Sequence, residues 1–194
     1  SRIKQLLLDP TKAIAEGKRE KDSTQTLEIL IVEWLLAALA VFILFSQFTK
    51  AAAVTTAGAA VLSLSVLVIG ILSTLFFAFL IQFVFHILGG KGKYLSGMMT
   101  AVYGKFPIIT GLLFASLLSY TPVVGVPAGI LAALVFVVSG LATFYRAARE
   151  FFAVDLLTAW IGLSILIAAL LITVYLVGVP ILLGQFARLG LPFT

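Results

Sequence analysis

The sequence predicts an all-α fold, a polytopic integral membrane protein built as a five-transmembrane-helix bundle. Three observations predict it: the composition, the length of the uncharged runs and the placement of the basic residues. Of the 194 residues, 62% are hydrophobic and 11% are charged, and the mean hydropathy is +1.20. A soluble domain carries roughly 25% charged residues. This chain lacks the polar side chains that would cover a water-soluble globule, so lipid must be its solvent.

The composition also excludes several kinds of chemistry. The chain has no cysteine, which excludes disulfides, thiolate metal sites and thiol catalysis. It has one histidine, His86, and few acids near the apolar runs. A lipid-modifying enzyme needs several carboxylates or histidines at one depth. We therefore expect a protein that is not an enzyme, with no metal, no cofactor and no nucleic-acid partner.

Residues 1–28 form a basic, amphipathic segment that we expect in the cytoplasm. Asp9 can cap a helix and Pro10 suits its first position, so a short helix is expected from there to a stop at Gly17. An amphipathic piece of this kind, with lysines beside it, is expected to lie on the membrane surface. Before it, one face of a first short helix carries the apolar residues Ile3, Leu6 and Leu7.

Residues 29–194 form the membrane domain. Residues 51–88 are a run of 38 without charge, and as one helix they would reach about 57 Å, beyond a hydrocarbon core of roughly 30 Å. Residues 51–60 are therefore expected to be an outer interfacial lead-in, and residues 178–194 an apolar tail in the far interface. The five spans are expected at about 29–48, 61–88, 95–118, 128–145 and 156–177.

Turn residues and one proline punctuate these spans. Residues 89–94 read Gly-Gly-Lys-Gly-Lys-Tyr and predict a loop, and residues 119–127 contain two prolines and a glycine and predict a tight hairpin. Pro107 lies inside the third span, where it removes a backbone hydrogen bond and predicts a helix kink.

The basic residues fix the expected orientation. Lys and Arg gather on the cytoplasmic side of membrane proteins. With the N-terminus inside and five spans, 11 of the 13 basic residues face the cytoplasm, and only Lys50 and Arg188 fall outside. We expect a multi-pass protein whose C-terminus lies outside.

Three short motifs in this order resemble those of a known family. They are Leu-Asp-Pro-Thr-Lys-Ala at 8–13, Gly-Gly-Lys-Gly-Lys-Tyr at 89–94 and Ala-Val-Tyr-Gly-Lys-Phe-Pro at 101–107. With the five-span layout they resemble the Yip family, the Ypt/Rab-interacting integral membrane proteins, in its prokaryotic form.

The resemblance implies a five-helix domain with a cytoplasmic N-terminus in a prokaryotic cell membrane. In eukaryotic members it implies work in membrane trafficking between endoplasmic reticulum and Golgi through Rab GTPases. This chain departs from them: its N-terminal segment of 28 residues has no Asp-Leu-Tyr-Gly-Pro-like element, and a prokaryotic member has no Rab to bind.

Ionisable residues within or beside the spans are the first functional candidates, because each costs about 2.5–3.5 kcal/mol at mid-bilayer. We expect them in the cytoplasmic third as a polar cluster, with Lys105 paired to one of the two acids. The competing interpretation is interfacial pairing, since Trp34 and Trp160 lie nearby in sequence and tryptophan favours the interface. The four candidates are Glu33, His86, Lys105 and Asp155.

A second group of residues is expected to contact anionic lipid. The glycines of the 89–93 loop would let backbone N–H groups approach a phosphate, although a plain positive-inside turn explains the same residues. His86 would act as a pH-sensitive or headgroup-binding residue, or simply cap a helix end. The basic residues expected to contact lipid are Lys91, Lys93, Arg146 and Arg149.

These observations predict a non-catalytic membrane protein of the Yip type that organises partner proteins or lipids at the cytoplasmic face. The expected partners are anionic headgroups, and a homo-oligomer or other membrane proteins. The alternative is a small transporter or channel subunit with a polar crevice around Lys105, and a flux assay would distinguish the two.

Overall fold

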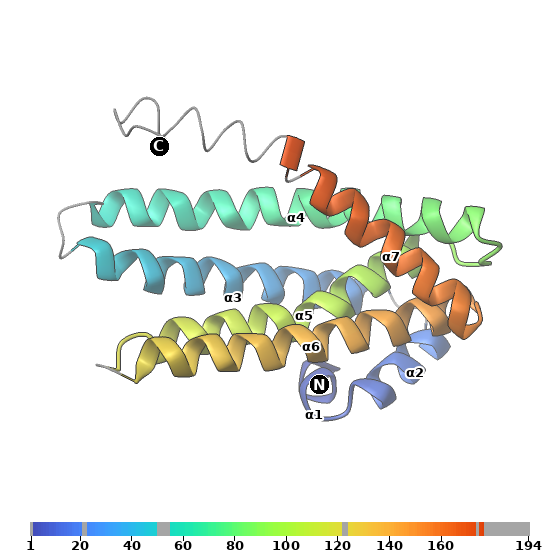
Figure 1. Ribbon diagram of the computed structural model, residues 1–194, viewed down its shortest axis with the longest axis horizontal. Helices are drawn as coiled ribbons and strands as arrows, with labels where there is room; N and C mark the ends of the chain where they lie inside the picture. The colour runs from blue at the N-terminus through green and yellow to red at the C-terminus, as the bar shows by residue number, and fades with distance from the viewer. Residues whose placement is uncertain (1, 21–22, 50–54, 122–123, 174, 177–194) are drawn as a thin grey trace.

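A computed structural model describes residues 2–20, 23–49, 55–121, 124–173 and 175–176 (Figure 1). Within these ranges the chain is all-helical, and five of its helices are long and apolar enough to cross a membrane. The predicted fold class is confirmed. The helices are α1 (Arg2–Leu8), α2 (Pro10–Glu20), α3 (Ser23–Thr49), α4 (Thr56–Ile87), α5 (Tyr94–Leu118), α6 (Gly125–Phe152) and α7 (Leu156–Thr173).

Several helices are longer than the membrane spans expected from the sequence, because the residues that flank those spans are also helical. α3 begins at Ser23, six residues before the span expected from 29, and α4 begins at Thr56, so residues 56–60 are helix. Thr55 caps α4, because its hydroxyl accepts the N–H of Gly58 at 3.1 Å. Threonine and alanine are ordinary helix residues once a cap is present, so residues 56–60 of the expected lead-in belong to α4, and residues 51–54 lie outside the described residues.

The C-terminal end of α6, at Phe152, lies beyond residue 145, where the fourth span was expected to end. The last turns alternate buried Ala147, Ala148 and Phe152 with exposed Arg146 and Arg149. This pattern lets the helix leave the apolar layer and still pack on the bundle. The expected end of the fifth span at 177, and the tail at 178–194, lie outside the described residues.

α5 is the central helix of the bundle. In its most apolar stretch 56% of residues are buried, against 17–28% in the other four spans, and α3, α4 and α6 all pack against it (Figure 1). Pro107, where a kink was expected, is buried within α5, and the helix continues on both sides of it. The remaining faces of the bundle are apolar and exposed, as a lipid-facing surface requires.

Glycines repeat every seven residues on α5, and each allows a close helix contact. A Cβ at Gly97 would lie 2.3 Å from the carbonyl oxygen of Ala78 on α4; one at Gly111 would lie 2.2 Å from the Cβ of Phe136 on α6. Gly104 faces Phe144 of α6 in the same way. Small residues of this kind let membrane helices approach until their backbones touch.

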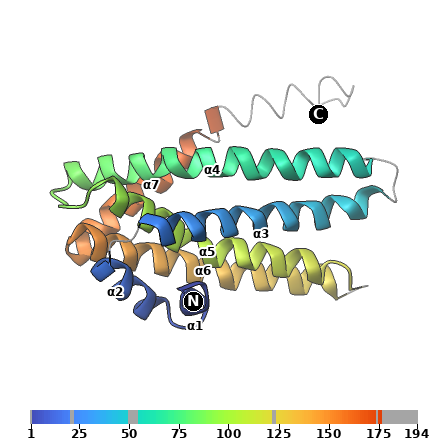
Figure 2. The same ribbon diagram turned by 180° about the vertical axis from the view of Figure 1, so that it is seen from behind.

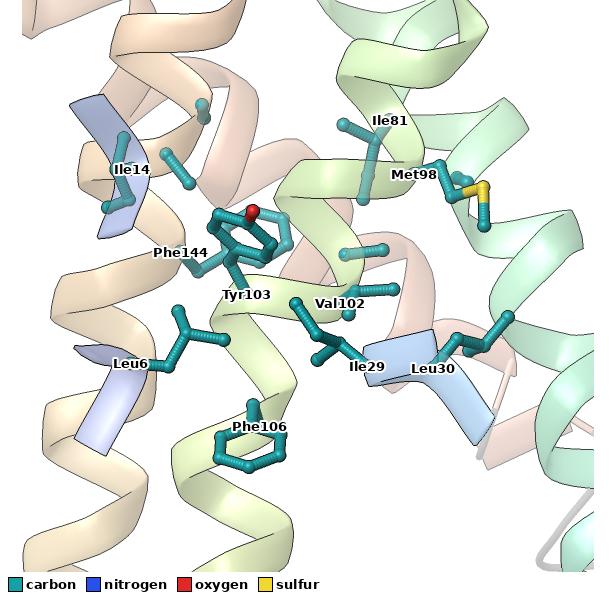
Figure 3. Close-up of a cluster of buried hydrophobic side chains, with 14 of the residues drawn as sticks. Leu6, Ile14, Ile29, Leu30, Ile81, Met98, Val102, Tyr103, Phe106 and Phe144 are labelled. Atoms are coloured by element: carbon teal, nitrogen blue, oxygen red, sulfur yellow. The ribbon is translucent and has the colours of Figure 1, made fainter. Parts of the chain in front are cut away.

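The N-terminal helices pack on the bundle and bury part of their apolar surface against it, while Leu7 and Leu8 stay exposed. Leu6 and Ile14 are each 1% exposed and join the core formed by α5 and α6 (Figure 3). α2 continues past Gly17, where a stop was expected, because Gly17 lies against the ring of Tyr103. Figure 2 shows the two helices beneath the same end of the bundle as the α4–α5 and α6–α7 loops.

The α4–α5 loop begins with a tight helix ending. Gly89 has a positive φ of 84° and donates its N–H to the carbonyl of His86 at 3.1 Å, while Gly90 donates to that of Phe85 at 2.8 Å. This pair of bonds is a Schellman motif, which needs a residue without a Cβ at the left-handed position. The two glycines are therefore explained by the end of α4.

We expect Gly111→Val to separate α5 from α6. The added side chain would overlap Phe136, and overpacking of this kind costs about 1–3 kcal/mol. The midpoint of unfolding by sodium dodecyl sulfate in mixed micelles would fall accordingly. The control is Ala142→Val, which adds bulk to an exposed position of α6. Equal midpoints for the two variants would contradict the close contact.

Candidate functional site

An ion pair lies inside the bundle where α3, α4 and α5 meet. Lys105 Nζ of α5 lies 3.4 Å from Glu33 Oε1 of α3. The Glu33 side chain is fully buried and that of Lys105 is 22% exposed. Each residue lies ten or eleven positions after the start of its helix, or about 15–17 Å along it, so the two charges share one depth.

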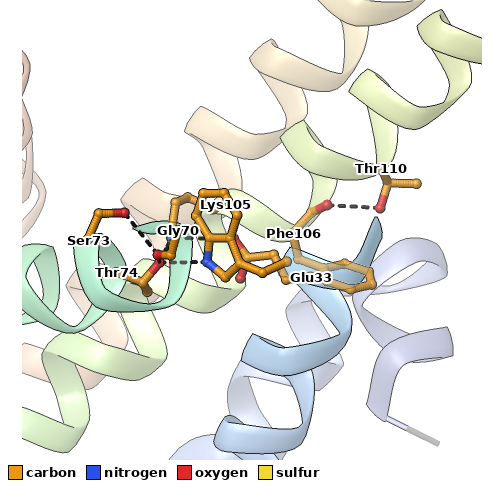
Figure 4. Close-up of polar contacts among 8 residues, drawn as sticks. Glu33, Gly70, Ser73, Thr74, Lys105, Phe106 and Thr110 are labelled. Atoms are coloured by element: carbon orange, nitrogen blue, oxygen red, sulfur yellow. Dashed lines mark hydrogen bonds and ion pairs between the residues drawn. The ribbon is translucent and has the colours of Figure 1, made fainter. Parts of the chain in front are cut away.

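Thr74 of α4 (Figure 4) and Trp34 of α3 complete this cluster. The Lys105 ammonium donates a hydrogen bond to the Thr74 hydroxyl oxygen. The Trp34 indole N–H donates to the same oxygen at 2.9 Å, and Thr74 donates in turn to the carbonyl of Gly70 at 2.9 Å. The Lys105 ammonium also lies 5.0 Å from the centre of a Trp34 ring, within the range of a cation–π contact.

Gly70 is required for this arrangement. A Cβ at Gly70 would lie 2.1 Å from the Trp34 ring, so the indole packs directly on the α4 backbone. Trp34 was expected to mark the membrane interface, but it points into the bundle and bonds to Thr74. Trp160, by contrast, is 63% exposed on α7.

The pair can be buried because its two charges compensate each other. Removing a charge from water is costly, and a buried partner recovers that cost only at short range. Neither oxygen of Glu33 accepts a hydrogen bond from the described residues, so Lys105 is the group that compensates its charge. The cluster therefore joins three helices through one set of polar contacts.

The structure places the other two expected members elsewhere. Asp155 is exposed between α6 and α7, where its Oδ1 accepts the Thr158 N–H at 2.8 Å and caps α7. This bonding to Thr158 holds the pKa of Asp155 below its usual value. His86 is exposed in the last turn of α4. Of the two acids considered for Lys105, Glu33 is the one it meets.

A basic cavity lies at the end of the bundle that carries the α4–α5 and α6–α7 loops. Its volume is about 350 Å³, and α2, the α4–α5 loop, the start of α5 and the end of α6 all contribute to its wall. Lys18, Lys91 and Lys93 line it together with one acid, Glu150. Lys18 Nζ lies 3.0 Å from Glu150 Oε2, and both side chains are partly exposed, at 49% and 40%.

The α4–α5 loop contributes the side chains of Lys91 and Lys93 to this cavity. Several backbone N–H groups of the loop donate hydrogen bonds within the protein. Gly89 and Gly90 cap α4, and Lys91 donates its N–H to the Phe152 carbonyl at 3.0 Å. Gly92 packs against the Phe152 ring, where a Cβ would lie 2.4 Å from a ring carbon. The N–H groups of Gly89, Gly90 and Lys91 therefore hold the loop in place by hydrogen bonds within the protein.

Sequence analysis missed four of these residues. Thr74 and Gly70 belong to a stripe of small buried residues on α4, with Ser63 and Ala78, and that helical spacing is a readable signal. Lys18 and Glu150 are far apart in the sequence, and nothing local predicts their contact. Arg146 and Arg149, expected beside Lys91 and Lys93, are exposed on α6 outside the cavity wall. The described residues include no group of three or more metal-ligating side chains.

We expect Glu33 and Lys105 to be coupled in a double-mutant cycle. Lys105→Met leaves the Glu33 carboxylate buried without its cation, and breaking a buried pair from one side costs about 3–5 kcal/mol. The double variant Glu33→Gln with Lys105→Met removes both charges and recovers much of that loss. The unfolding midpoint of all four proteins in mixed micelles measures the cycle. Additive losses would show that the two side chains act independently.

The comparisons with known proteins agree with this architecture. A family model described as the Yip1 domain matches residues 4–179, most of the chain. No curated protein and no solved structure matches significantly. Members of this family are generally non-catalytic membrane proteins. The family match and the five long apolar helices lead to one conclusion: the chain belongs to the Yip1 domain family, as a multi-pass membrane protein.

Proposed function

We propose that this protein binds anionic phospholipid headgroups at its cytoplasmic face and so organises lipid there without catalysing a reaction. The observation that carries the proposal is the cavity lined by Lys18, Lys91 and Lys93. A volume of about 350 Å³ lies within the range of small-molecule sites. Lysines near a membrane surface attract anionic lipid by about 1 kcal/mol each.

The position of the cavity supports this function. The loop between α4 and α5 and the loop between α6 and α7 lie at one end of the bundle, beside α1 and α2 (Figure 1). A cavity at that end opens at headgroup depth when the helices span a bilayer. The proposal places this end in the cytoplasm of a prokaryotic-type member, with the N-terminus on the same side.

The alternative function, a small transporter with a crevice around Lys105, has less support. Lys105 contacts Glu33, Thr74 and Trp34, so its ammonium is engaged in holding helices together. Binding of partner proteins remains compatible with the proposal, because headgroup binding uses the inner end and leaves the long apolar faces of α6 and α7 exposed.

We expect Lys91→Gln with Lys93→Gln to weaken the binding of anionic lipid by about 30-fold, since two contacts of about 1 kcal/mol are lost. Purified protein in detergent, titrated with short-chain phosphatidylglycerol and followed by native mass spectrometry, gives the affinity. Phosphatidylcholine of the same chain length serves as the uncharged reference.

The matched control is Lys4→Gln with Lys12→Gln. These lysines are exposed on α1 and α2 and do not line the cavity, while the change in net charge is the same. A similar loss of affinity in both double variants would contradict a specific site and leave only general attraction to the surface.

The orientation can be mapped with single cysteines, since the chain has none of its own. We expect Thr121→Cys, between α5 and α6, to react with a membrane-impermeant maleimide added to intact cells. Lys93→Cys should react only after the membrane is opened, because the positive-inside arrangement places it in the cytoplasm. The reverse pattern would overturn the proposed orientation.

A further inference from the structure

The cavity contains an acid as well as three lysines, and this acid has a use in headgroup recognition. We propose that Glu150 makes the cavity selective for phosphomonoester headgroups over phosphodiester headgroups, by occupying Lys18 until a more highly charged ligand displaces it. The inference rests on the proposed function and adds the class of headgroup. Its basis is the juxtaposition of Lys18 and Glu150, 3.0 Å apart, with Lys91 and Lys93.

The charges in the cavity divide into two sets. Glu150 neutralises Lys18, whereas the ammonium groups of Lys91 and Lys93 make no ion pair or hydrogen bond within the described part of the chain. A phosphodiester carries one negative charge, and the two available lysines are enough to bind it. A phosphodiester gains little binding energy from Lys18, because contact with that lysine requires breaking its ion pair with Glu150.

A phosphomonoester gains more from contact with Lys18 than a phosphodiester does. It carries about −1.5 to −2 charges at neutral pH and three strong acceptor oxygens. The additional charge and the third oxygen favour a third ammonium group. The Lys18–Glu150 pair is partly exposed on both sides, and pairs of this kind are weak enough to exchange. A phosphomonoester can therefore take Lys18 from Glu150, while a phosphodiester cannot do so as readily.

The start of α5 supports an anion in the same place. α5 begins at Tyr94, its cap residue Lys93 provides no side-chain hydrogen bond, and Ser96 in its first turn lines the cavity. The N-terminus of a helix attracts negative charge. An oxygen that points away from Lys91 and Lys93 would thus face the beginning of α5.

A purely mechanical role for the Lys18–Glu150 pair predicts something else. α2 packs on α6, and the pair joins the two helices. If it served only to anchor α2, its removal would change the affinity for every headgroup in the same direction. The ratio of the affinities for the two classes of headgroup therefore distinguishes a role in selectivity from a role in anchoring α2.

The test measures the affinities of short-chain phosphatidic acid and short-chain phosphatidylglycerol, which share acyl chains and differ in the phosphate. For the wild type we expect phosphatidic acid to bind about fivefold more tightly, the worth of one added lysine contact. Glu150→Gln frees Lys18, so the affinity for phosphatidylglycerol should rise about fivefold and the ratio should approach one. Lys18→Gln leaves Glu150 unpaired beside either lipid, so both affinities should fall, and that of the more highly charged phosphatidic acid should fall more, which lowers the ratio.

Glu28→Gln is the control, because it makes the same change of charge at an exposed position of α3 outside the cavity; its ratio should equal that of the wild type. Equal affinities in the wild type, or an equal loss for both lipids in Glu150→Gln, would overturn the selectivity and leave anionic-lipid binding intact. Absence of any preference for anionic over zwitterionic lipid would overturn the proposed function itself. Competition by glycerol 3-phosphate as strong as that by phosphatidic acid would overturn a lipid as the source of the phosphomonoester.

Discussion

The close approach of α5 to its neighbours is the constraint on which the rest of the structure depends. Lipid chains are as apolar as the helix faces, so burial of apolar surface cannot by itself assemble a bundle in a membrane. Contact between backbones supplies the missing attraction, and it requires small residues. Gly97 and Gly104 provide it against Ala78 and Phe144, and Gly111 admits the side chain of Phe136 in the same way. Because α5 touches α4 and α6 at fixed positions, the C-terminal ends of those two helices are held beside the start of α5, where the basic cavity lies.

The Glu33–Lys105 pair fixes how far the packed helices are shifted along one another. Van der Waals contacts along a helix can slide by a turn at modest cost, whereas a buried charge has to find its partner at one position. Thr74 and Trp34 link the pair to α4, so a shift of any one helix would disturb contacts to the other two. The polar cluster thus fixes the relative heights of α3, α4 and α5, which the apolar faces leave nearly free.

Much of the fold was predictable because lipid imposes simple rules on sequence. Long uncharged runs become helices, and the predicted five appear as α3 to α7. The ends were less predictable, since capping by Thr55 and the amphipathic last turns of α6 carry helix beyond the apolar layer. For the site, the sequence named Glu33 and Lys105 by their charge. It could not separate Glu33 from Asp155, because Asp155 is satisfied locally by Thr158. Lys18 and Glu150 meet only through the docking of α2, a long-range contact without a local signal.

The length of α4 has a consequence for the surrounding bilayer. Its 32 residues span about 48 Å, against a hydrocarbon thickness of roughly 30 Å. Such a mismatch is relieved by tilt or by local thickening of the bilayer. Trp34 packs on Gly70 and couples the inclination of α4 to that of α3, and the Schellman turn at Gly89 ties the lower end of α4 to the wall of the cavity. If the cavity binds headgroups as proposed, a change in bilayer thickness that tilts α4 will also move one wall of that cavity.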